Sequence, residues 1–349
     1  MSAMVGLASA ISDVIPLRAY RRIIPRELVG FVYHLVSEQP GPHVRHLYSC
    51  KTPEMFERDL IYLSQKFALP EYDQLFGGNG GVSLAREKKA AAFVTFDDGL
   101  AECSSVVGPI LVKHRVPCIF FIITECIDNR RMMYRHKVSL CISKMLEMDS
   151  DLISGSGLSS ILMSAADTKA DLINTVLSLK EKDSARIERV CETLEVDCKS
   201  YLEKKKPYLT QGQIKELMRS GFKIGAHTRR HPFLADLTAE EIEAEIVGSC
   251  NEVRDITGDD KVPFAFPFSG AGVERAFVQY LRQKHLVIGP VFDTGGVASD
   301  APFVFNRIAA DCPASNGAFR TNIPDLLHGA YRSTFLAGLR AMVPGFARN

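Results

Sequence analysis

The sequence contains no tryptophan, no excess of either charge and no paired cysteine motif. Any aromatic stacking on a ligand must therefore come from the 20 Phe or the 10 Tyr residues. Lys and Arg total 42 against 41 Asp and Glu, so the charge balance gives no reason to expect binding to nucleic acid. The nine cysteines are scattered without a CxxC pair, which favours a reducing compartment over a disulfide framework.

Long hydrophobic runs are also lacking, and none reaches the roughly 18 residues that a membrane span needs. Residues 1–17 are apolar but carry no basic n-region, so a signal peptide is the less favoured interpretation. Residues 18–24 and 330–346 mix Arg with bulky apolar residues at helical spacing, which favours surface helices but leaves peripheral membrane contact open. We expect a cytoplasmic protein, with peripheral attachment at the inner face of the membrane as the alternative.

Short apolar runs rich in β-formers recur along the chain and alternate with helical patterns. Strands are predicted at residues 29–36, 90–96, 118–124, 223–226, 262–268 and 286–292. Helices are predicted from Thr52 with Pro53 at the first position, at 210–220 and at 238–257. Such alternation is typical of βα units, so we expect an α/β fold, a barrel with its active site at the carboxyl ends of the strands.

One stretch breaks the alternation. Residues 128–207 have helical periodicity, are rich in Lys, Glu, Ser and Leu, and contain no convincing strand. We interpret them as a helical insertion over one rim of the barrel, a solvated decoration rather than a lid or an oligomer contact. The expected organisation is an N-terminal helical segment (1–28), a barrel (29–310, with the insertion at about 128–207) and a C-terminal helical tail (311–349).

Two adjacent carboxylates, Asp97 and Asp98, follow the second predicted strand and precede Gly99, which permits a tight turn. Adjacent carboxylates repel each other, and this cost is understandable if a cation neutralises one and leaves the other as a base. An Asx turn that caps the next helix is the alternative interpretation.

Two histidines, His227 and His231, follow the fourth predicted strand four residues apart. On one helical turn, residues at this spacing face the same way and can share a metal. The alternative is a pair of surface histidines beside a turn. Two imidazoles and one carboxylate together would leave open positions on a metal, which is the arrangement that binds and acidifies water.

The two motifs together resemble the polysaccharide deacetylases (carbohydrate esterase family 4, the NodB-homology domain). Residues 95–99 are similar to the first motif of this family and residues 227–232 to the second, and both are complete. The similarity extends to the flanking residues 208–210, 220–226 and 237–241. It covers roughly residues 31–308, and the 128–207 insertion is poorly matched.

The resemblance implies a deformed (β/α) barrel and a divalent metal, usually zinc, held by Asp98, His227 and His231. It also implies that Asp97 is the base that deprotonates the attacking water. A metal and a backbone N–H would stabilise the tetrahedral oxyanion.

Residues 264–270 resemble the third motif of the family, in which the aromatic residue after a proline lends a backbone N–H and walls the pocket. We therefore expect Thr95, Pro267 and Phe268 around the substrate and its oxyanion. The family often carries an Arg before this proline that orients the base, and this sequence has Phe or Ala there. Another group must then orient Asp97, or its position is looser.

The general acid of the family lies in a late Leu-x-His motif, whose nearest formal match here ends at His328. His328 is therefore the candidate acid, although its helical surroundings also fit a surface histidine. His34 and His285 are alternatives, and each also fits an ordinary buried or rim histidine.

From these residues we expect a metal-dependent hydrolase that removes the N-acetyl group from an N-acetylated sugar of a polysaccharide, a lipid-linked glycan or a glycoconjugate. An O-acetyl esterase or a non-sugar amidase could use the same centre. A carbohydrate-binding protein with a decayed active site is the alternative from another class, because the motif arginine is missing and the acid is not placed. The expected partner is an N-acetylated glycan, with no nucleic acid.

Overall fold

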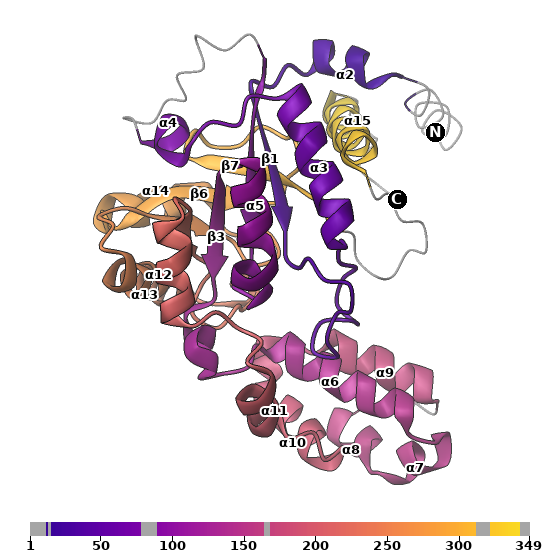
Figure 1. Ribbon diagram of the computed structural model, residues 1–349. Helices are drawn as coiled ribbons and strands as arrows, with labels where there is room; N and C mark the ends of the chain where they lie inside the picture. Colours follow the sequence, from indigo (N-terminus) through magenta and orange to yellow (C-terminus); the bar gives the residue numbers. More distant parts are fainter. Residues whose placement is uncertain (1–11, 13–14, 78–88, 164–167, 312–321, 343–349) are drawn as a thin grey trace.

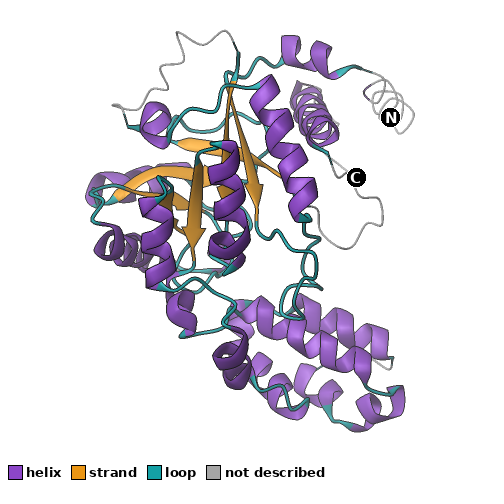
Figure 2. Cartoon of the chain, viewed as in Figure 1, coloured by secondary structure: helices purple, strands orange, loops and turns teal. Residues whose placement is uncertain are grey.

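Seven parallel strands close into a barrel in which each strand pairs with its neighbours in chain order. The computed structural model describes residues 12, 15–77, 89–163, 168–311 and 322–342. Figures 1 and 2 show the strands surrounded by helices, as expected for a (β/α) barrel. The strands are β1 (Leu28–Tyr33), β2 (Ala91–Phe96), β3 (Cys118–Ile122), β4 (Lys223–Ala226), β5 (Val262–Ala265), β6 (Ile288–Asp293) and β7 (Val304–Ala309).

The last strand, β7, is the one that the sequence did not predict. Asn306 and Arg307 interrupt its apolar residues, so it gives no continuous hydrophobic run. It nevertheless pairs with both β6 and β1 and thereby closes the barrel. In the register with β1, Arg307 lies opposite Gly30, where an added Cβ would lie 2.9 Å from the Arg307 Cγ. The small residue on β1 therefore leaves room for the large side chain on β7.

The outer helices begin where the sequence places good N-caps. Thr52 accepts a hydrogen bond from the Met55 N–H at the start of its helix, and Thr210 and Thr238 form capping boxes. Their apolar faces pack on the outward-facing side chains of the strands. The helices are α3 (Pro53–Lys66), α5 (Gly108–His114, preceded by a π-helical turn, Cys103–Val107), α12 (Gln211–Arg219), α13 (Ala239–Thr257) and α14 (Arg275–Lys284).

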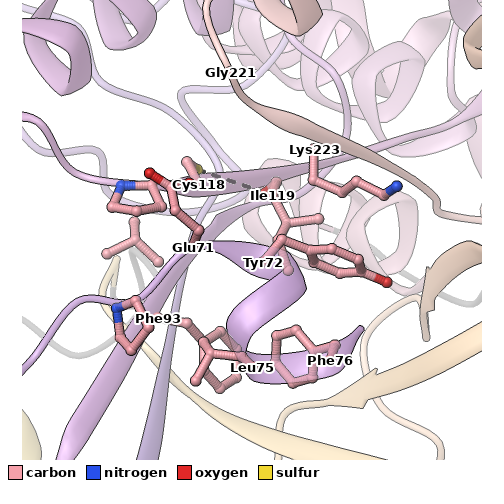
Figure 3. A pocket seen from close by; sticks show the side chains of 12 residues that line it. Glu71, Tyr72, Leu75, Phe76, Phe93, Cys118, Ile119, Gly221 and Lys223 are labelled. Carbon is pink, nitrogen blue, oxygen red and sulfur yellow. Dashed lines mark hydrogen bonds between the residues drawn. The ribbon is translucent and has the colours of Figure 1, made fainter. Parts of the chain in front are cut away.

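The amino ends of the strands are closed by an aromatic plug. Phe93, Phe121 and Phe292 point inward, and helix α4 (Tyr72–Phe76) adds Phe76 against them. Figure 3 shows the small gap left beside α4, which has a volume of about 20 Å³. This is space for roughly one water molecule, so we interpret the gap as a packing defect rather than a ligand site.

The predicted insertion is a helical lobe beside the barrel in Figure 1, with its own hydrophobic core. That core includes Leu35, Leu100 and Ile123, from the loops that follow β1, β2 and β3. Tyr208, at the end of the lobe, accepts a hydrogen bond from the Met133 N–H at its beginning. The lobe is therefore fixed to the carboxyl ends of the strands. Its helices are α6 (Tyr134–Glu147), α7 (Ser150–Gly155), α8 (Leu158–Leu162), α9 (Lys169–Ser178), α10 (Ser184–Thr193) and α11 (Cys198–Lys205), with 3₁₀ turns at Thr124–Asn129 and Glu181–Asp183.

The two ends of the described chain meet on one side of the barrel. Helix α2 (Leu17–Ile23) packs on α15 (Ile323–Met342), which in turn contacts α3 and β7. These are surface helices with one face on the fold, as the sequence favoured. Among the helices that the structure describes, none combines the length and the hydropathy of a membrane span. The signal-peptide question concerns residues outside the described part, and the three-segment division of the chain stays a prediction.

Candidate active site

The carboxylates of the first motif reach the interior because of strand alternation. Phe93 and Thr95 of β2 face inward, so Asp97, the residue after the strand end, continues the same face. Asp98 and Gly99 then take positive φ angles of 71° and 69°. A Cβ on Gly99 would lie 2.9 Å from the Ile122 Cγ2 as well as being strained, so this sharp turn requires glycine.

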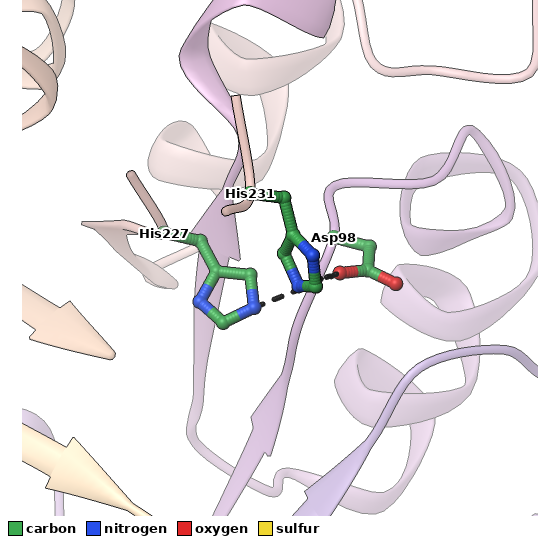
Figure 4. A group of neighbouring side chains, drawn as sticks. All are labelled: Asp98, His227 and His231. Carbon is green, nitrogen blue, oxygen red and sulfur yellow. Dashed lines mark ion pairs between the residues drawn. The ribbon is translucent and has the colours of Figure 1, made fainter. Parts of the chain in front are cut away.

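The second motif brings two imidazoles to the same carboxylate. Figure 4 shows His227 and His231 converging on Asp98. The His227 Nε2 lies 3.6 Å and the His231 Nε2 3.4 Å from the same oxygen, Asp98 Oδ1. All three residues are buried, with at most 5% of their surface exposed. Asp98, His227 and His231 are thus assembled as the sequence predicted.

The loop that carries the histidines is not the helical turn that their spacing suggested. Residues 227–233 form an irregular loop in which Thr228 and His231 have φ angles of 62° and 63°. The Thr228 hydroxyl accepts the His231 N–H, and the buried Glu245 of α13 accepts the N–H groups of Arg229 and Arg230. These bonds satisfy the loop backbone and hold both imidazoles in place.

The hydrogen-bond partners and the burial of the three side chains suit a metal ion. The His227 Nδ1 lies 2.9 Å from the Ala265 carbonyl, which fixes the proton on Nδ1 and leaves the Nε2 lone pair free. Burial, together with His227 and Arg135, lowers the pKa of His231 well below its usual value, so this ring is neutral. Asp98 Oδ1 is buried without a hydrogen-bond donor. An orphaned carboxylate oxygen between two free imidazole nitrogens fits a divalent cation.

Metal binding can be tested through stability. Because a cation that binds only the folded chain stabilises it by mass action, Zn²⁺ at 100 times its Kd should add about 2.7 kcal/mol. We expect Zn²⁺ to raise the thermal midpoint of the wild type but not that of His227→Ala. His285→Ala is the matched control, because His285 pairs with Glu243 away from this group. Equal stabilisation of the wild type and His227→Ala would place the metal elsewhere.

The orientation of Asp97, for which the sequence offered no partner, comes from Arg307 on β7. The guanidinium donates from Nη1 to Asp97 Oδ1 at 2.7 Å and from Nη2 to Oδ2 at 2.9 Å. Arg307 is fully buried, lies over the Phe121 ring and also donates to the Thr95 hydroxyl. Burial alone would raise the pKa of Asp97, but Arg307 and His227 outweigh it and lower the pKa. Asp97 is therefore held as a carboxylate.

The remaining oxyanion candidates lie in two different settings. Thr95 is fully buried, with its hydroxyl between Arg307 and the Phe31 carbonyl, so it supports the arginine instead of facing an open space. Pro267 is buried, and Phe268 after it has a φ of 58°. The centre of the Phe268 ring lies 4.6 Å from the centre of the His231 ring. The Phe268 N–H has no acceptor in the described part of the chain. Phe268 therefore keeps a free donor beside the histidines.

His328 is not brought to this group. Its Nε2 lies 2.8 Å from the Ile15 carbonyl, and its ring packs on Tyr20, where α15 meets α2. His34, the alternative, directly follows β1. The Asp97 N–H donates to the Tyr33 carbonyl, so His34 and Asp97 leave neighbouring strands side by side. His285 pairs with Glu243 on the outside of the barrel.

His34 is held by a carboxylate that the sequence did not single out, Asp311. This residue follows β7, accepts the His34 backbone N–H at 2.6 Å and lies 2.9 Å from the ring Nδ1. Burial lowers the pKa of His34, but Asp311, with smaller contributions from Asp98 and Asp97, raises it to about 9. The side chain is 26% exposed. A protonated imidazole with access to the exterior thus stands beside the carboxylate group.

Comparisons with known proteins agree with the second motif and with the barrel fold. The polysaccharide deacetylase family model matches residues 175–287, which include β4, β5 and both histidines. The deacetylase PplD of Streptococcus pyogenes, in complex with acetate, has a TM-score of 0.51 at 15% identity over 87% of this chain and 97% of that one. IcaB from Ammonifex degensii has a TM-score of 0.51 at 16% identity, with the same coverage. At such identities the likeness shows a shared fold. No curated protein sequence matches the chain.

The closed parallel barrel carries grouped carboxylates and imidazoles at its carboxyl edge, which is the usual place for an active site in this fold. The polysaccharide deacetylase model matches residues 175–287 of the 349, so this part of the chain is similar to that family.

Proposed function

We propose that this protein is a metal-dependent N-deacetylase of an N-acetylated sugar. One observation carries the proposal: Asp98, His227 and His231 converge within 4.8 Å of one another beside Asp97, a carboxylate kept ionised by Arg307. The two neighbouring aspartates thus have different surroundings and can take different roles.

Asp98, His227 and His231 would hold the cation, and three protein ligands leave positions open for water and substrate. When bound, a divalent cation supplies Lewis-acid chemistry that polarises the acetyl carbonyl and acidifies the attacking water. Zinc is the cation that we propose, because two imidazoles and one carboxylate are typical zinc ligands. The Phe268 N–H is free to donate to the carbonyl oxygen as it gains charge.

Asp97 and His34 would divide the proton transfers. Water adds to the acetyl carbon, and Asp97 takes the proton that it loses. The bond between carbon and nitrogen then breaks, and His34 gives its proton to the nitrogen, so that acetic acid, which ionises to acetate in water, and a free amine leave. A proton passing from Asp97 back to His34 restores the starting state. We propose His34 for this role, and not His328, because His34 is protonated and beside Asp97.

The protonated acid also favours an amide over an ester as the substrate. An amine is a poor leaving group unless its nitrogen is protonated, whereas the oxygen of an ester can leave with less help. A histidine whose pKa is raised to about 9 remains an acid at neutral pH. We therefore propose N-deacetylation as the main activity.

Acetate release tests this function. The purified chain would be incubated with N-acetylglucosamine oligomers and with O-acetylated sugars, before and after chelation and after Zn²⁺ is restored. We expect acetate from the N-acetyl substrates, loss of release on chelation, and recovery with metal. Release that resists chelation although the metal has been removed would contradict the proposed centre. A faster reaction with O-acetyl than with N-acetyl substrates would favour the esterase.

A further inference from the structure

The helical insertion contributes one cation to the catalytic end of the barrel, Arg135. This residue lies in the first turn of α6 and is partly buried. Its guanidinium carbon is 5.3 Å from the centre of the Phe268 ring, and that ring in turn is 4.6 Å from the His231 ring. One aromatic side chain therefore separates Arg135 from a proposed metal ligand.

The guanidinium of Arg135 is not paired with any carboxylate of the described residues. Within the described ranges it makes no ion pair and no hydrogen bond, whereas its neighbour Arg131 pairs with Glu125 at 2.7 Å. Arg130 is likewise occupied, because it donates to the carbonyls of Ile127 and Thr124. A positive charge in the first turn of a helix is also disfavoured by the helix dipole. The position of Arg135 is therefore not explained by the stability of α6.

A second polar group without a partner among the described residues lies beside the proposed acid, His34. The Tyr48 ring stacks on His34 with 4.8 Å between the ring centres. Its hydroxyl is buried and has no hydrogen-bond partner among the residues that the structure describes. Burial, Asp98 and Asp311 raise the pKa of Tyr48, while the charge of Arg135 lowers it. Buried hydroxyls normally have partners, so the Tyr48 hydroxyl is available to a bound polar group.

We propose that Arg135 and Tyr48 bind an anionic oxygen group, a phosphate or a carboxylate, that the substrate carries close to the acetamide. A guanidinium binds two oxygens of such a group through its planar fork, and a tyrosine hydroxyl donates a third hydrogen bond. An anion also offsets the repulsion between Arg135 and a cation held by His231. The inference rests on the proposed function and narrows its substrate from acetylated sugars in general to acidic ones.

The test compares three sugars that share one N-acetylhexosamine ring. They are a neutral methyl glycoside, the 1-phosphate and the N-acetylated uronic acid. Comparison of the last two shows whether the site prefers a phosphate or a carboxylate. Acetate release is measured for the wild type, Arg135→Met, Arg135→Lys and Lys144→Met. Lys144 is the matched control, because it is a cation at the other end of α6.

We expect the wild type to prefer one acidic sugar over the neutral one in kcat/KM. Arg135→Met should reduce this preference by about 10- to 100-fold, mainly through KM, because a hydrogen bond to a charged group is lost. Arg135→Lys should retain part of the preference and Lys144→Met all of it. The proposal is overturned if the wild type shows no preference for an acidic sugar, or if the preference survives in Arg135→Met. It is also overturned if Arg135→Met lowers kcat/KM for all three sugars equally.

Binding separates this inference from the proposed function. If the wild type releases no acetate from any of the three sugars, the deacetylase proposal fails. Calorimetry with the 1-phosphate, the uronic acid and the neutral glycoside then decides the role of Arg135 independently. Tighter binding of an acidic sugar that is lost in Arg135→Met would support the anion site, and equal binding of all three would refute it.

Discussion

His34→Gln is expected to lower kcat for an N-acetyl sugar by about 10²- to 10⁴-fold, the usual contribution of a positioned general acid. Gln can keep a polar contact with Asp311 but cannot give a proton to the leaving nitrogen. KM should change less, because the proton is needed only as the bond breaks. Steady-state acetate release measures both constants.

Two comparisons make this prediction specific. An O-acetyl ester with a good leaving group should lose much less rate in His34→Gln, because its oxygen leaves without a proton. His328→Gln is the matched control, because its ring contacts the Ile15 carbonyl and Tyr20. If His328→Gln lowers kcat as much as His34→Gln does, the assignment of the acid is wrong.

The pH dependence follows from the pair of His34 and Asp311. Because the pKa of His34 is raised to about 9, the acid form is present below this pH and is lost as pH rises through it. Asp311→Asn removes the largest contribution that raises this pKa, so the acid should be lost at a lower pH. We expect the alkaline limb of kcat/KM to move to lower pH in Asp311→Asn. An unmoved limb would show that another group titrates there.

The grouping of Asp98, His227 and His231 could be predicted from the sequence because each motif is local. Asp98 follows a recognisable apolar strand, and His227 and His231 follow another, so parallel pairing alone brings them to one edge. The four-residue spacing of the histidines wrongly predicted a helical turn. The loop is irregular, and hydrogen bonds to Thr228 and Glu245 hold it in place.

The groups that hold Asp97 and His34 could not be predicted, because barrel closure brings them together. Arg307 is 210 positions from Asp97 and Asp311 is 277 from His34 in the chain. Both lie on or after β7, whose polar residues conceal it as a strand. The sequence held one usable signal: Arg307 is isolated in a segment of β-forming residues, and such an arginine suggests a buried partner. Arg135 gave no such signal, because its position depends on how the insertion packs.

Arg307→Met is expected to damage both stability and catalysis. Removing one partner of a buried ion pair leaves the other charge uncompensated and typically costs about 3–5 kcal/mol. The loss should appear in denaturant unfolding at neutral pH. In the remaining folded protein, kcat should fall by at least about 10²-fold, because misplacing a catalytic group has effects of that size.

The pH profile distinguishes this role from a purely structural one. Arg307 lowers the pKa of Asp97, so the carboxylate and the stability that it provides persist to low pH and are lost only as pH falls through that lowered pKa. Without the guanidinium the pKa of Asp97 rises, and the base is protonated at a higher pH. The acid limb of kcat/KM should therefore move upward in Arg307→Met and less in Arg307→Lys, which keeps the charge but loses the two-pronged contact. A variant that is destabilised but keeps the wild-type acid limb would show that Arg307 supports the barrel without setting the charge of Asp97.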